Sequence, residues 1–118
     1  MSPESFRIAV PETKLDDLRR RLDNVNWPHD YENDDWAYGV PRPYLEELVG
    51  YWRDVFDWRA AEAEMNDLSH FRTEVDGLPI HFVHERGRGP NPTPIILSHG
   101  WPWTFWDLKE IIPALTHP

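Results

Sequence analysis

The sequence predicts an α/β protein in which a helical first part precedes a short β region. Three observations lead to this prediction. Apolar residues recur at helical spacing through most of residues 1–69, two alternating segments flank the turn signal Asp76-Gly77, and the apolar run Pro94–Ser98 leads into a sharp turn and another helix. We therefore expect a helical region over residues 1–69 and the start of a β-containing core over residues 70–118.

The first part is predicted to hold three helices, after an extended segment at Phe6–Val10. The first helix opens at Pro11, with acidic residues early and arginines late, which suits the helix dipole. The second helix opens at Pro43, and the third runs from Trp58 to about Leu68. Between the first two helices, residues 26–42 show neither helical nor strand periodicity, so this connection should be irregular. The second helix should bury an apolar stripe made of Leu45, Leu48, Val49, Trp52, Val55 and Phe56.

The second part begins with a predicted antiparallel hairpin. Residues 71–75 and 80–84 alternate between apolar and polar side chains on either side of Asp76-Gly77. The run Pro94–Ser98 has no alternation, which is typical of a strand buried on both faces. Thr104 and Asp107 then have the spacing of a capping box, so a helix should follow. Its apolar positions are Phe105, Leu108, Ile112 and Leu115.

Composition excludes several classes of protein. The 118 residues carry a formal net charge of −9, which argues against binding to nucleic acid or to an anionic membrane. No cysteine is present, so neither disulfides nor thiolate metal sites are possible. The first residues lack an apolar run, so we expect no signal peptide or membrane anchor and a cytoplasmic protein.

No histidine cluster has the spacing of a metal site. His81 and His84 are three residues apart on a predicted strand, so they should point to opposite faces. His29, His70 and His117 are isolated in the sequence. We therefore expect no metal and no cofactor.

The turn His99-Gly100-Trp101-Pro102 carries the main functional signal. It resembles the His-Gly-X-Pro turn of α/β-hydrolases, and more narrowly that of microsomal-type epoxide hydrolases. Many hydrolases carry this turn, but the resemblance extends through most of the chain. The upstream segments that share it are Trp27-Pro28, Trp36–Gly39, Tyr51-Trp52, Phe56–Arg59 and Asp76–Phe82.

The resemblance implies a role for each residue of the turn. The backbone N–H of Trp101 would be one donor of an oxyanion hole, in a turn shaped by Gly100 and Pro102. His99 would be structural, with a buried imidazole bonded to backbone, because the family's catalytic histidine comes later in the chain. Asp107 would be a helix-capping acid and not the nucleophile.

Three aromatic residues are candidates for the wall of an apolar pocket: Trp36, Tyr38 and Trp103. Simple packing of the irregular segment against the core explains them equally well. Relatives usually have glycine at the position of Trp103, so this chain departs from the family pattern there. A bulky ring at this position would narrow the pocket or change access to it.

The implied fold is a helical N-terminal meander followed by the first three strands and first helix of an α/β-hydrolase, and it is incomplete. The implied parent enzyme opens an apolar epoxide with an aspartate, forms an ester, and hydrolyses it to a diol. The nucleophile, acid, histidine and lid tyrosines would lie beyond Pro118, so we expect the chain alone to be inactive. Its strand Pro94–Ser98 would lack neighbours and so pair with another copy, the hairpin or the missing portion.

Two other classes of protein remain open on the sequence. The chain could be the front of a different α/β-hydrolase, such as a serine esterase, which the elbow residue of the missing part would decide. It could also be a non-catalytic interaction module that retains only the N-terminal region.

Overall fold

The computed structural model describes residues 2–117 and separates them into two compact units. One unit contains residues 9–58, and the other combines the segment up to residue 8 with the segment from residue 59. The second unit thus brings the N-terminal segment to the hairpin. The functional boundary that we expect at residue 69 stays a prediction.

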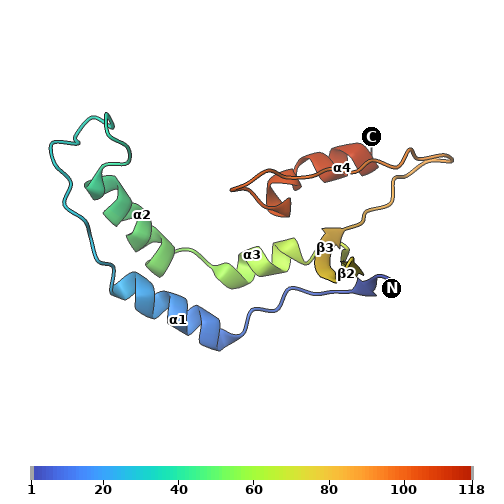
Figure 1. Ribbon diagram of the computed structural model, residues 1–118, viewed down its shortest axis with the longest axis horizontal. Coiled ribbons are helices and arrows are strands. Elements are labelled where there is room, and N and C mark those ends of the chain that lie inside the picture. Colours follow the sequence, from blue (N-terminus) through green and yellow to red (C-terminus); the bar gives the residue numbers. More distant parts are fainter. Residues whose placement is uncertain (1, 118) are drawn as a thin grey trace. The chain divides into compact units, whose positions relative to one another are not determined.

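The unit of residues 9–58 is built on two helices, α1 (Glu12–Asp23) and α2 (Arg42–Asp54) (Figure 1). Both were predicted, and each begins directly after a proline that ends the preceding extended chain. The helices pack against each other, and α1 buries Leu15 and Leu22. Among the described residues, the only other buried apolar residue is Pro41.

Helix α2 does not bury the stripe predicted for it. Trp52 is 46% exposed, and no residue of α2 is buried. The periodicity correctly predicted the helix, but its contacts with α1 leave the stripe partly exposed. The expected burial of Trp52 is therefore wrong for this chain, and truncating its ring should cost less than the 3–5 kcal/mol typical of an enclosed aromatic.

The connection between α1 and α2 is irregular, as expected from its lack of periodicity (Figure 1). Asn33 organises it, because its buried side chain accepts a hydrogen bond from the Tyr38 N–H (3.2 Å) and donates one to the Gly39 carbonyl (3.3 Å). Trp36 adopts a positive φ of 67° within this loop and packs against Tyr44. The hydrogen bonds of this one buried side chain thus order a loop that has no regular secondary structure.

The other unit contains helix α3 (Trp58–Met65) and an antiparallel sheet in the order β1-β2-β3. The strands are β1 (Glu4–Ser5), β2 (His70–Val75) and β3 (Leu78–Val83). The hairpin was predicted, whereas β1 lies just before the extended segment expected at Phe6–Val10. Helix α3 ends three residues earlier than predicted.

The β2–β3 register follows from the tight turn between the strands. Asp76 and Gly77 both have positive φ, at 51° and 80°, as a two-residue turn that continues the twist of a hairpin requires. Val75 then pairs with Leu78, and every later pair follows. Pro79 is tolerated because β3 lies at the edge of the described sheet and needs fewer N–H donors.

Asn66 fixes the segment that follows β1. Its side-chain oxygen accepts a hydrogen bond from the Ile8 N–H (2.9 Å), and its side-chain nitrogen donates to the Ile8 carbonyl (2.8 Å). Just before it, the Phe6 N–H donates to the His70 carbonyl at 2.9 Å. The N-terminal segment is therefore held first by β2 and then by the end of α3.

The predicted strand Pro94–Ser98 does not form. These residues belong to no helix or strand, and Ile95, Ile96 and Leu97 are 60%, 96% and 41% exposed. A strand needs a hydrogen-bonding neighbour, and within residues 2–117 none pairs with this segment. The expectation of a buried third strand is thus wrong for the chain as it stands.

The helix expected after the turn is divided in two. A 3₁₀ helix, η1 (Phe105–Leu108), precedes α4 (Ile111–Thr116). Pro113 gives the physical reason, because it has no N–H for the Lys109 carbonyl and its ring would clash with that carbonyl in a continuous α-helix. The fold is thus mixed α/β, but without the buried strand and single helix that were predicted.

Among residues 2–117, we find no helix with both the length and the apolar character needed to cross a bilayer. The cytoplasmic location expected from the sequence stays a prediction.

Candidate functional site

The turn at His99–Pro102 is closed by a backbone hydrogen bond and followed by a capped helix. The Trp103 N–H donates to the Gly100 carbonyl at 2.8 Å, and the Trp101–Pro102 peptide bond is cis. The Asp107 carboxylate accepts from the Thr104 N–H (2.8 Å), and the Thr104 hydroxyl accepts from the Trp106 N–H (3.2 Å). The predicted capping box is confirmed, and it gives Asp107 a local structural role.

The side chains of the turn are open to solvent. Trp101 is 94% exposed and Trp103 is 63% exposed, while His99 is exposed as well. The prediction of a buried structural imidazole at His99 is therefore wrong for this chain. The reason is the same as for Pro94–Ser98: the strand that would carry His99 into a sheet has no neighbour here.

The Trp101 N–H is the group to which the resemblance to epoxide hydrolases assigns a role. In the described chain this N–H donates no hydrogen bond, whereas the Trp103 N–H two residues later is used to close the turn. Pro102, between them, has no N–H. The Trp101 N–H is thus an unused backbone donor within a turn that a hydrogen bond closes.

Trp36 and Tyr38 belong to the unit of residues 9–58, whereas Trp103 belongs to the other unit. Trp36 is 52% exposed and rests on Tyr44, with ring centroids 4.9 Å apart, and Tyr38 is 82% exposed. Their expected place in one pocket wall stays a prediction.

A histidine pair on the hairpin was missed by the sequence analysis. His70 Nδ1 lies 2.9 Å from His81 Nε2, and His70 Nε2 lies 2.7 Å from the Met65 carbonyl oxygen. His70 is 3% exposed, so it is not the isolated histidine that was expected. The rings of Phe6 and Phe105 contact both imidazoles edge-on, at centroid distances of 5.1–6.5 Å.

The register of the hairpin could have revealed this pair. With a two-residue turn at Asp76-Gly77, His81 must pair with Arg72, which places it diagonally across from His70 on the same face. Phe71 and Phe82 stack on the other face, where His84 also contacts Phe71. The prediction that His81 and His84 point to opposite faces agrees with these contacts.

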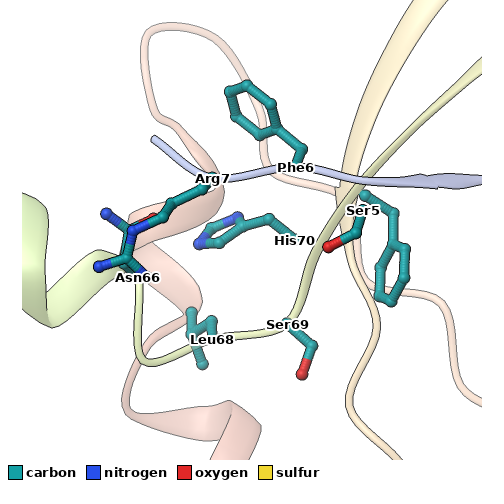
Figure 2. Close-up of a pocket in the computed structure, with 8 residues that line it drawn as sticks. Ser5, Phe6, Arg7, Asn66, Leu68, Ser69 and His70 are labelled. Carbon is teal, nitrogen blue, oxygen red and sulfur yellow. The ribbon is translucent and has the colours of Figure 1, made fainter. Parts of the chain in front are cut away.

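His70 also lines an open pocket of about 370 Å³ beside β2. Figure 2 shows its imidazole pointing into the space bounded by Phe6, Arg7 and Asn66, with Leu68 and Ser69 below. No acidic residue lines this pocket in the described chain. Burial lowers the pKa of His81 below its ordinary value, and the neighbouring His70 and Arg72 lower it further. The environment therefore favours a neutral His81.

The described residues contain no group of three or more histidine or carboxylate side chains that could hold a metal ion. The two imidazoles of the pair are joined by a direct hydrogen bond, which uses the nitrogens that a metal would need.

Comparison with known proteins shows which family has this sequence. Residues 3–108 match the family described as "Epoxide hydrolase N terminus". The chain is 48% identical over 113 residues to a putative epoxide hydrolase of Stigmatella aurantiaca, covering 96% of this chain and 26% of that protein. It is 35% identical over 117 residues to epoxide hydrolase 1 of Oryctolagus cuniculus, with the same coverage.

A solved structure gives the same answer for the fold. The epoxide hydrolase of Aspergillus niger superposes with a TM-score of 0.88 at 31% identity, over 97% of this chain and 30% of that one. The fold is thus that of the N-terminal part of epoxide hydrolase structures, within the wider class of mixed α/β proteins. The chain belongs to the epoxide hydrolase N-terminal family. It spans about a quarter of the length of the curated relatives it matches.

Proposed function

We propose that the chain is the N-terminal part of an enzyme that hydrolyses epoxides to vicinal diols, and that it supplies one oxyanion-hole donor, the Trp101 N–H. The single observation that carries this proposal is the closed His99–Pro102 turn, which leaves that N–H without an acceptor in the described chain. Membership of the epoxide hydrolase N-terminal family supports the reaction class.

The proposed reaction has two steps. An aspartate carboxylate oxygen attacks an epoxide carbon, the carbon–oxygen bond opens, and the alkoxide takes a proton from lid tyrosines. This step forms an ester, and the groups that perform it would lie in the longer protein. In the second step a histidine-activated water attacks the ester carbonyl, and the diol leaves when the aspartate is regenerated.

The Trp101 N–H would act in the second step. When water attacks the ester carbonyl, the carbonyl oxygen becomes an oxyanion, and a donor fixed toward it stabilises that charge more than the neutral ester. Pro102 and the bond from Trp103 to Gly100 would keep the donor aimed, because neither allows the turn to open freely. None of these steps calls for a cofactor.

The substrate would be a small, apolar epoxide held against aromatic side chains. Trp36, Tyr38 and Trp103 are the residues we propose for contact with the substrate in the longer protein, because each ring is at least half exposed. Trp103 would limit the size of the substrate on the side of the turn.

The experiment compares this chain with the longer protein that carries it. Each is supplied with a styrene-oxide-type substrate, diol formation is measured, and mass in solution is determined by light scattering. We expect turnover only from the longer protein, because the proposed nucleophile and base would lie in its remaining part. Turnover by the chain alone, abolished by a substitution within it, would contradict the proposal. Hydrolysis of simple esters but not epoxides by the longer protein would point to an esterase.

A further inference from the structure

The His70–His81 pair lies between two phenylalanine rings that come from distant parts of the chain. Phe6 follows β1, and Phe105 is the first residue of η1, directly after the turn and its cap. Both rings meet the imidazoles close to perpendicular, with interplanar angles from 69° to 90°. The histidine pair is therefore the surface on which η1 docks to the sheet.

The hydrogen bonds determine which nitrogens carry protons. The Met65 carbonyl can only accept, so His70 Nε2 must carry the hydrogen in this 2.7 Å contact. In a neutral His70 the Nδ1 is then an acceptor, and His81 Nε2–H donates to it across 2.9 Å. The neutral pair thus satisfies every nitrogen that is directed inward.

The pair tolerates double protonation poorly. If both imidazoles are charged, two N–H groups face each other across the same short distance, and one bond is lost. Three charged groups lie near the pair: Arg72 on β2 raises the cost of charging His81, Arg7 lines the pocket beside His70, and Glu4 on β1 pairs with Arg72 on the same face of the sheet. Helix α3 presents the Met65 carbonyl and the neutral Asn66, and η1 presents the Phe105 ring.

The docking surface is linked mechanically to the turn. The capping box joins Thr104 to Asp107 around Phe105, and the bond from Trp103 to Gly100 closes the turn immediately before it. The turn has little packing of its own, because Trp101 and Trp103 are largely exposed. Besides the contact of Phe105 with the sheet, the solvent-exposed ion pair Lys109–Glu64 (3.2 Å) joins this segment to α3, and such pairs contribute little.

We propose that His70 and His81 are positioning residues for the turn at His99–Pro102. In their neutral, hydrogen-bonded state they hold Phe105 against the sheet, and through the capped η1 they hold the Trp101 N–H in place. Charging the pair releases η1 and lets the turn move. The catalytic part of this proposal rests on the proposed function, whereas the docking part does not.

The docking part is tested by nuclear magnetic resonance on the 118-residue chain between about pH 8 and pH 5. At the higher pH, imidazole nitrogen shifts should show hydrogen on Nε2 of both His70 and His81. On acidification, the protection factors of the Asp107 and Lys109 amides should fall about tenfold or more as the pair charges, while those of α1 stay constant. A pH-independent η1 in the wild-type chain would overturn the proposal.

Two substitutions of His81 and one control sharpen the test. The His81→Gln amide can donate to or accept from His70 Nδ1, so η1 should stay protected and the pH step should vanish. His81→Leu leaves Nδ1 without a donor and should lower protection at every pH. His84→Gln, on the opposite face, should keep the wild-type step. The pair's role would be refuted if the fall in η1 protection on acidification survived in His81→Gln or disappeared in His84→Gln. This holds even if His81→Leu fails to fold.

The catalytic part is tested in the longer protein. His81→Leu should lower kcat about tenfold and lower KM with it, leaving kcat/KM nearly unchanged, because the displaced donor acts after ester formation; His81→Gln should restore kcat at pH 8. Unchanged kcat in a folded His81→Leu enzyme would remove the catalytic role alone. An absence of epoxide hydrolysis in the wild-type enzyme would defeat the proposed function, while the resonance experiment would still decide the docking role.

Discussion

The hairpin β2–β3 and the segment Pro94–Ser98 have comparable strand-forming sequences but opposite outcomes. The hairpin is fully paired along six residues of each strand, whereas Ile96 is 96% exposed in a segment with no strand at all. The hairpin finds its partner across a two-residue turn, so little loop entropy opposes pairing. The segment has no such neighbour. Strand propensity alone therefore does not make a strand; an available partner does.

The largest expected effect concerns hydrogen exchange in Ile95–Leu97. If these residues pair only in the longer protein, their amides should exchange there about a thousandfold more slowly than in the chain alone, because opening then requires breaking a sheet. The paired amides of β2 serve as the control and should be protected in both proteins. Protection of Ile95–Leu97 in the isolated chain would break the contrast between the two segments.

The next effect concerns the Trp101 N–H in the longer protein. Trp101→Pro deletes the donor and should lower the rate of ester hydrolysis about a hundredfold or more, while Trp101→Phe keeps the N–H and most of the activity. The accumulation of the ester intermediate, followed by mass spectrometry, distinguishes the hydrolytic step from ester formation. Equal losses in both variants would assign the effect to the side chain.

The smallest effect tests the turn that makes the hairpin self-sufficient. Gly77→Ala places a Cβ on a residue with φ of 80° and should lower the free energy of unfolding by about 1–2 kcal/mol. Gly50→Ala is the matched control, because this glycine lies inside α2 with nothing within 4 Å of the added Cβ and should gain about 0.5–1 kcal/mol. Urea denaturation measures both. If both substitutions changed the free energy of unfolding by similar amounts in the same direction, the positive φ at Gly77 would not be what stabilises the hairpin.

The elements that the sequence predicted well depend on neighbours close in the chain. Helix α1, the turn at Asp76-Gly77 and the capping box at Thr104 all follow from contacts within a few residues. The division of the last helix at Pro113 could also have been predicted, because the missing N–H is a local property.

The errors concern partners that are distant or absent. The burial of Trp52 and His99 was inferred from patterns that need a second surface, and this chain does not supply it. The His70–His81 contact needed the hairpin register to be extended from the turn to residue 70, a step that treating each histidine separately omits. The turn of the candidate site could be recognised from its residues, but its exposed setting could not.

Asn66 shows how one side chain can stand in for a piece of main chain. Its amide presents one acceptor and one donor to Ile8, just as a peptide group of an adjacent strand would. Deamidation to aspartate would therefore do more than add a charge: it would set two acceptors against each other at the Ile8 carbonyl. Chemical ageing at position 66 would loosen the N-terminal segment where it leaves the sheet.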